Sequence, residues 1–285
     1  MSFPAPIQEK SAATQAFYRA SLVPALVLWL LPLIAIAFTS IRSIDELNQG
    51  NFWGWPEETR FVENYTAVFT QSPMGRFLLN SVLITVPAVA LAVGLSAMAG
   101  YALAKYRFRG NLVLFAIFIA GNFVPFQILM IPVRDLFVNV VPLYDTILAL
   151  VLFHMAFQTG FCTLFMRNFI KQIPDALIEA ARVEGVSELR IFWHVVLPLV
   201  RPAMAALAVL VFTFVWNDFF WALVLVQSDE VRPVTAGLQA LRGTWTAAWQ
   251  LISAGAIVAA LPPVALFFLM QRHFIAGLTL GATKG

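Results

Sequence analysis

The chain has 285 residues, of which 60% are hydrophobic and 12% charged, and its mean hydropathy is +0.82. A soluble domain carries about 25% charged residues, so the composition excludes an ordinary water-soluble fold and predicts a chain surrounded by lipid. The net charge of +3 is too small to indicate nucleic-acid binding. Cys162 is the only cysteine, which excludes an internal disulfide and a cysteine-based metal site.

Six stretches are long and apolar enough to cross a bilayer, which takes about 20 residues. The sequence therefore predicts an all-α polytopic membrane protein with six transmembrane helices. Only the fifth stretch contains a formal charge, Asp218. We expect one membrane domain, 20–272, between an N-terminal segment 1–19 and a tail 273–285. The six stretches are 20–41, 77–104, 111–133, 146–166, 202–227 and 243–271.

The connections between these stretches differ in charge. Twelve of the 18 Lys and Arg residues lie on the side of the termini, three of them in the turn 105–109, and six lie on the other side. An excess of cations marks the cytoplasmic side, so both termini are expected in the cytoplasm. The longest outer loop, 42–76, carries Trp53 and Trp55 and could form a small cap or an interfacial aromatic anchor.

The loop 168–201 is too long for an unstructured connection in a compact protein. Pro174 suits a first helical position, and a left-handed residue at Gly185 would end that helix. Ser187 is expected to cap a second short helix, which Pro198 would end. The pattern alone leaves two interpretations open: a hairpin resting on the lipid headgroups, or a docking element for a cytoplasmic partner.

The residues of this loop carry a resemblance. Glu179-Ala180-Ala181, three residues, Gly185, nine residues and then Val195-Val196-Leu197-Pro198 resembles the EAA loop of ABC-importer permeases. That family pattern ends in Ile-x-Leu-Pro, so Val195 is a conservative departure. Ile173-Pro174, Trp216-Asn217-Asp218 and the C-terminal residues from Gln271 are similar to the maltose-type carbohydrate permeases, and more narrowly to the second-permease (MalG-like) subunit.

This resemblance implies a type I ABC importer permease fold in the bacterial inner membrane. The chain would pair with a homologous second permease, two ATPase subunits and a periplasmic or extracellular sugar-binding protein. The EAA loop would be the coupling helix that lies in a groove of an ATPase. Glu179 would pair with a cation there, Ala180 and Ala181 would permit close approach, and Gly185 would make the bend. The motif would close at Leu197 and Pro198.

The chain has no GxxxxGK[ST] phosphate loop. We therefore expect a non-catalytic subunit without a bound cofactor or metal, with ATP and Mg²⁺ on the partner ATPases. The resemblance implies import of an oligosaccharide or glycoside, and the sequence does not identify which one.

Polar residues inside the spans are candidates for the substrate pathway. Asn217 and Asp218, between Trp216 and Trp221, could bind sugar hydroxyls with aromatic stacking. They could equally lock helices together or cap an unwound turn, and we favour that structural role.

Asn122 and Gln127 flank Pro125, near an expected helix break, and could line the passage. His154, in the fourth stretch, is expected to be a hydrogen-bond donor between helices and not a proton relay.

Two other classes of membrane protein have requirements that this sequence can be compared with. A stand-alone secondary transporter or channel would need ion-coupling carboxylates near the middle of the membrane, and no such residue is predicted there. An intramembrane enzyme would need paired catalytic groups within the spans. Asp218 and His154 are expected on different helices at different depths, which speaks against such a pair.

Overall fold

The computed structural model describes the backbone of residues 7–241 and 248–280, and the side chains of residues 7–239, 241 and 248–271. Every regular element within these ranges is a helix. The chain divides into two compact units, residues 1–72 with 240–258, and residues 73–239 with 259–285. Within the described ranges, five helices are long and apolar enough to cross a membrane. A sixth span results if the bent pair Asn111–Gly121 and Phe126–Val140 is counted as one. The all-α prediction is confirmed, and the count of six holds with this broken span included.

The first unit is built on α1 (Ala12–Ile41), followed by two short helices, α2 (Ile44–Asn48) and α3 (Phe61–Thr70). α1 begins well before the predicted span start at residue 20. The outer loop that follows it is folded around a buried ion pair of 2.8 Å between Arg42 and Glu46.

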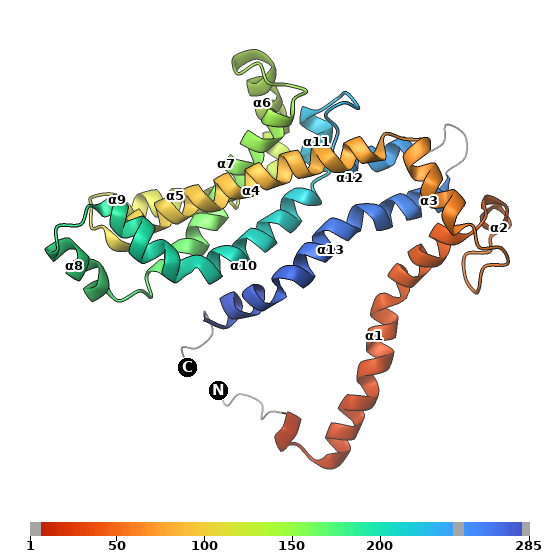
Figure 1. Ribbon diagram of the computed structural model, residues 1–285, viewed down its shortest axis with the longest axis horizontal. Helices are drawn as coiled ribbons and strands as arrows, with labels where there is room; N and C mark the ends of the chain where they lie inside the picture. The colour runs from red at the N-terminus through yellow and green to blue at the C-terminus, as the bar shows by residue number, and fades with distance from the viewer. Residues whose placement is uncertain (1–6, 242–247, 281–285) are drawn as a thin grey trace. The chain divides into compact units, whose positions relative to one another are not determined.

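The second unit is centred on α4 (Met74–Lys105), α7 (Ile147–Ile170) and α10 (Leu197–Trp216), which run alongside one another (Figure 1). A small residue recurs at every fourth position on the buried face of α4. Small side chains let two helices approach closely, and a Cβ atom at Gly100 would lie 2.9 Å from the backbone nitrogen of Arg167 in α7. The small residues are Ala88, Ala92, Ser96 and Gly100.

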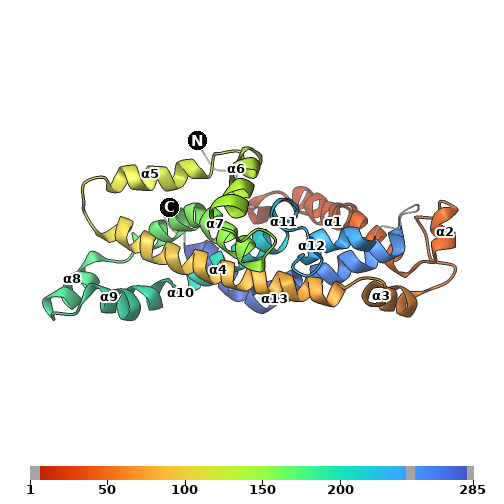
Figure 2. The same ribbon diagram turned by 90° about the horizontal axis from the view of Figure 1, so that it is seen from above.

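The third span is broken, as the Pro125 signal predicts. α5 (Asn111–Gly121) ends ahead of the proline, and the chain resumes at Phe126 in a direction that differs by 90° (Figure 2). The second arm contains α6 (Met130–Asp135) and a π-helical turn, Leu136–Val140. It extends beyond the predicted end at residue 133.

The predicted second short helix of the loop 168–201 does not end at Pro198. After α8 (Asp175–Val183), the chain runs without interruption from α9 (Glu188–Ile191) through a π-helical turn, Phe192–Val196, into α10. The missing N–H of a proline breaks an ordinary helical hydrogen bond. Here the preceding turn is already in the wider π register, with the Leu197 N–H bonded to the Phe192 carbonyl, and the proline is accommodated at the start of α10.

The helix that holds the predicted fifth span, 202–227, runs from Glu188 to Trp216, so it begins earlier and ends earlier than predicted. Beyond Trp216 the chain forms two short helices, α11 (Phe220–Leu225) and α12 (Val234–Gly237), at the end of the unit opposite α8 and α9 (Figure 1).

The last helix, α13 (Trp249–Leu280), continues past residue 271, so the first part of the predicted tail 273–285 is helical. Residues 281–285 lie outside the described residues.

The close approach at Gly100 gives a test of the α4–α7 packing. We expect Gly100→Ala to lower the thermal unfolding midpoint of the purified protein, because overpacking a tight contact costs about 1–3 kcal/mol. Gly94→Ala in the same helix is the control, since a Cβ atom there would meet nothing within 4 Å. Fluorescence-detected size-exclusion chromatography after heating measures both. Equal midpoints for the two variants would contradict the close contact.

Candidate functional site

α8 presents an exposed face at one end of the second unit. Ile178 is buried and anchors the helix, whereas Glu179 and Ala180 are exposed and Ala181 is half-buried. Val183 at the end of the helix is 87% exposed. A face with small and apolar side chains around one carboxylate is suited to lie against another protein surface.

Gly185 ends α8 in the left-handed conformation, with φ of +74°, as the sequence predicts. The Gly185 N–H donates to the Arg182 carbonyl at 2.9 Å, and the Val186 N–H donates to the Ala181 carbonyl at 3.1 Å. This pair of bonds is the Schellman arrangement. A Cβ atom at Gly185 would meet nothing within 4 Å, so glycine is favoured there by the backbone conformation and not by lack of space.

A network that sequence reasoning missed fixes α8 and α9 to the end of α4. The Glu188 carboxylate accepts hydrogen bonds from the Arg182 guanidinium at 2.6 Å, the Tyr101 hydroxyl at 3.0 Å and the Tyr106 hydroxyl at 2.5 Å. The Arg182 hydrogen bond, helped by those of the tyrosines, lowers the pKa of Glu188 to about 2. The position of Glu188 just after Ser187 suggests only a helix start, and the Ser187 side chain makes no capping bond.

A second contact holds the start of α8. The Lys105 ammonium lies 2.6 Å from the Asp175 carboxylate and donates to the Ile173 carbonyl at 2.6 Å. The hydrogen bond from Lys105 to the Asp175 carboxylate lowers the pKa of Asp175. The segment from Ile173 to Glu188 is therefore held at both ends by the last residues of α4 and the turn that follows.

The remaining residues of the predicted coupling motif lie in the helix that enters the membrane. Leu197 is half-buried and Pro198 is exposed, and both belong to the first turn of α10. They connect α8 and α9 to the span and do not extend the exposed face of α8.

At the other end of α10, Asp218 supports a helix break. Its carboxylate accepts from the backbone N–H groups of Trp221 at 3.3 Å and Ala222 at 3.1 Å, two of the free donors in the first turn of α11. Its backbone carbonyl also accepts from the Thr235 hydroxyl of α12. This is the capping geometry that the sequence analysis favoured.

His154 and Asp218 lie together, so the expectation that they differ in depth was wrong. His154 Nε2 is 3.6 Å from Asp218 Oδ2, and His154 is 4% exposed. The two meet because α10 ends at Trp216, and Asp218, just beyond that end, lies beside His154 in the first third of α7. His154 Nδ1 has no hydrogen-bond partner among the described residues.

The two tryptophans of this region are buried. Trp216 is 2% exposed and donates from Nε1 to the Ala259 carbonyl at 2.9 Å. Trp221 is 3% exposed, and its ring centroid lies 3.8 Å from that of Phe153. Asn217 is exposed and donates to the Thr213 carbonyl at 2.9 Å. The indole rings therefore pack between helices, and no face of theirs is open to a sugar in this conformation.

Asn122 and Gln127 are both exposed at the break of the third span. The Asn122 amide donates to the Phe118 carbonyl at 2.9 Å and so covers the end of α5. Gly160 of α7 faces this point, because a Cβ atom there would lie 2.6 Å from the Phe118 carbonyl oxygen. The structure does not bring Asn122 and Gln127 together with Asp218 in one pocket.

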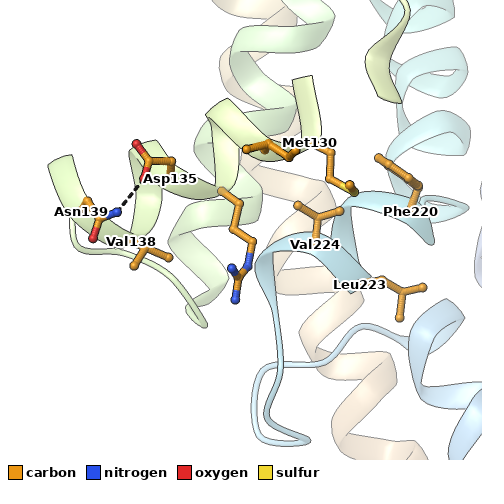
Figure 3. A pocket seen from close by; sticks show the side chains of 9 residues that line it. Met130, Asp135, Val138, Asn139, Phe220, Leu223 and Val224 are labelled. Carbon is orange, nitrogen blue, oxygen red and sulfur yellow. Dashed lines mark hydrogen bonds between the residues drawn. The ribbon is translucent and has the colours of Figure 1, made fainter. Parts of the chain in front are cut away.

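A hollow of about 570 Å³ lies between the second arm of the broken span and α11 (Figure 3). Asp135 and Asn139 are joined by a 2.6 Å hydrogen bond on one side of it, and Phe220 and Leu223 lie on the other. Arg134 also lines it. None of the pathway residues expected from the sequence lines this hollow.

Comparison with known proteins gives a family. The family model described as "Binding-protein-dependent transport system inner membrane component" matches residues 92–279. An osmoprotective compounds uptake permease, GgtD of Synechocystis sp., is 37% identical over 90% of this chain and 88% of its own length. The arabinooligosaccharides transport system permease AraQ of Halalkalibacterium halodurans is 34% identical over 89% of this chain and 91% of its own length.

The fold has a counterpart among solved structures. A chain of a bacterial ABC transporter involved in the import of the acidic polysaccharide alginate superposes with a TM-score of 0.79 at 24% identity, covering 93% of this chain and 99% of that one.

The cap at Asp218 can be tested by substitution. We expect Asp218→Ala to speed hydrogen exchange at the Trp221 and Ala222 amides, because losing a helix cap costs about 1 kcal/mol. Asp218→Asn keeps an acceptor oxygen and should give a smaller change. Asn217→Ala is the control, since its side chain bonds only a carbonyl of α10. Unchanged exchange in Asp218→Ala would remove the capping role.

The Glu188 network predicts a pH dependence. Because the pKa of Glu188 falls from an ordinary value of 4.5 to about 2 on folding, its carboxylate protects α8 above about pH 4.5. That protection is lost as the pH falls towards 2. We expect Glu188→Gln to speed hydrogen exchange in α8 at neutral pH and to differ least from the unaltered protein near pH 2. Glu184→Gln, at an exposed neighbouring carboxylate, should have no such effect; equal exchange in both variants would contradict the network.

Proposed function

The chain belongs to the family of inner membrane components of binding-protein-dependent transport systems, and we propose that it is the second, MalG-like permease of an ATP-driven importer for an oligosaccharide or glycoside. Members of this family are multi-pass, non-catalytic permeases of ABC importers that work with a binding protein and ATPase subunits. The alternative of a stand-alone transporter or channel is incompatible with that membership.

The sugar class rests on the relatives. The names of AraQ and of an alpha-glucoside permease, AglG of Rhizobium meliloti, point to carbohydrates. The alpha-glucoside permease is 32% identical over 79% of this chain and 60% of its own length. A homologous second permease would complete the translocation pathway.

The observation that carries the coupling proposal is the exposed face of α8. Glu179 and Ala180 point away from the unit while Ile178 and the Glu188 network hold the helix in place. We place this face against an ATPase subunit, with Glu179 paired to a cation there and the two alanines allowing a close fit. The orientation follows from the cation bias: the end that carries α8, and both termini, would be cytoplasmic.

At the outer end of the unit, the candidate pathway residues divide into two groups: some support the fold, and others are exposed. Asp218, Trp216 and Trp221 would act by holding the break between α10 and α11, and not by touching the solute. Asn122, Gln127 and Asn217 are exposed and available to line the passage once the second permease is in place.

The coupling proposal is tested in the reconstituted complex. We expect Glu179→Ala to lower ATP hydrolysis stimulated by the loaded binding protein by about 10-fold or more, since a hydrogen bond to a charged group contributes roughly 1.5–3 kcal/mol. Glu184→Ala is the matched control in the same loop and should keep the stimulation. The subunit should remain in the membrane in all variants.

Substitutions at Gly185 test whether glycine is needed for its positive φ or for its small size. A β-branched residue is strained at positive φ, whereas asparagine tolerates it. We therefore expect Gly185→Val to lose stimulated hydrolysis and Gly185→Asn to keep most of it. Normal coupled transport in both Glu179→Ala and Gly185→Val would refute the role of this loop.

A further inference from the structure

We propose that the turn between α4 and α5 forms a binding site for an anionic phospholipid. A hollow of about 730 Å³ lies between this turn and the end of α7. Four cations line it and no carboxylate does: Arg107, Arg109, Arg167 and Lys171. This surface adjoins the exposed face of α8 that is assigned to the ATPase, because Arg107 also lines a hollow with Glu179.

The four cations are not neutralised by the protein. None of them forms an ion pair with a carboxylate in the part of the chain that the structure describes. Asp175, the carboxylate that Arg107 influences, is bound to Lys105. Four like charges around one hollow repel one another, and an anion placed among them removes that repulsion.

Two of the cations differ in how they are held. Arg167 is half-buried, its Nε donates to the Leu103 carbonyl at 3.2 Å, and its guanidinium lies 3.8 Å over the ring centroid of Phe115. Arg109 is exposed on the turn. One fixed cation and three exposed ones can contact a phosphate from different directions.

The start of α5 faces the same hollow. Gly110, with φ of +91°, precedes the helix, no side chain caps it and its first turn has no acidic residue. The positive end of the helix dipole therefore adds to the field of the cations. It does not make a site alone, and the proposal rests on the cationic hollow.

The occupant is a lipid and not a soluble anion, because the hollow adjoins an apolar face. Leu112 is 72% exposed and Val113 is 64% exposed, and both line the hollow. They belong to the first turn of a helix that begins a membrane span. A phosphate among the cations would place its acyl chains along this face. Basic pockets between transmembrane helices on the cytoplasmic side are suited to anionic lipid headgroups.

The test uses the complete transporter, purified with its partner subunits in mixed micelles of phosphatidylglycerol and phosphatidylcholine. Mass spectrometry of the retained lipid gives the ratio of the two, compared with the ratio in the bulk micelles. We expect phosphatidylglycerol to be enriched on the unaltered complex. The triple variant Arg107→Gln, Arg109→Gln, Lys171→Gln should lose this enrichment, at roughly fivefold per cation near a lipid surface.

Arg201→Gln is the matched control, because Arg201 is an exposed cation at the same end of the unit that does not line the hollow. It should keep the enrichment. The single variant Arg109→Gln should give a smaller loss of the same kind and serves if the triple variant does not fold. Equal enrichment in the triple variant and the control overturns the proposal. Loss of the ATPase subunits with unchanged lipid also overturns it and assigns the hollow to a protein contact.

Discussion

Backbone groups at a broken helix have no water to bond with inside a bilayer, and the second unit meets this requirement with polar side chains. Asp218 accepts from the first amides of α11, and the Asn122 amide covers the last carbonyls of α5. The Asn80 amide, on α4, donates to the carbonyls of Glu230 and Arg232 in the loop before α12. The polar residues that look like a substrate site in the sequence are largely the ones that make the breaks possible.

Much of the fold could be predicted because it depends on local signals. Hydropathy and length locate the spans, Pro125 marks the break in the third, and Gly185 marks the end of α8. The fifth span could not be placed correctly, since an apolar run resumes at Phe219, directly after Asn217 and Asp218. Composition does not distinguish a continuing span from a break followed by a short apolar helix. The π-helical turn before Pro198 could not be predicted for a similar reason, because a proline is as typical of a helix end as of a helix that continues through a π turn.

The candidate site divides in the same way. The exposed face of α8 consists of small residues at helical spacing around Glu179, so it could be predicted from the sequence alone. The Glu188 network does not, because it joins residues separated by more than 80 positions, and each of them has an ordinary local explanation. The same is true of His154 and Asp218, whose contact depends on where α10 ends. Sequence patterns therefore predicted the small residues and the glycine bend of α8, and tertiary packing determined what holds the helix in place.

The turn after α4 links these parts into one mechanical unit. Lys105 and Tyr106 bind the two ends of the α8 segment, while the next residues, Arg107 and Arg109, line the cationic hollow. A displacement of α8 must therefore stretch these bonds or carry the turn with it. Since α4 packs along α7 through its small-residue face, the turn is joined to the span by a packed helix and not by a flexible linker. The residues that hold α8 and the residues that line the cationic hollow are therefore neighbours in one short turn.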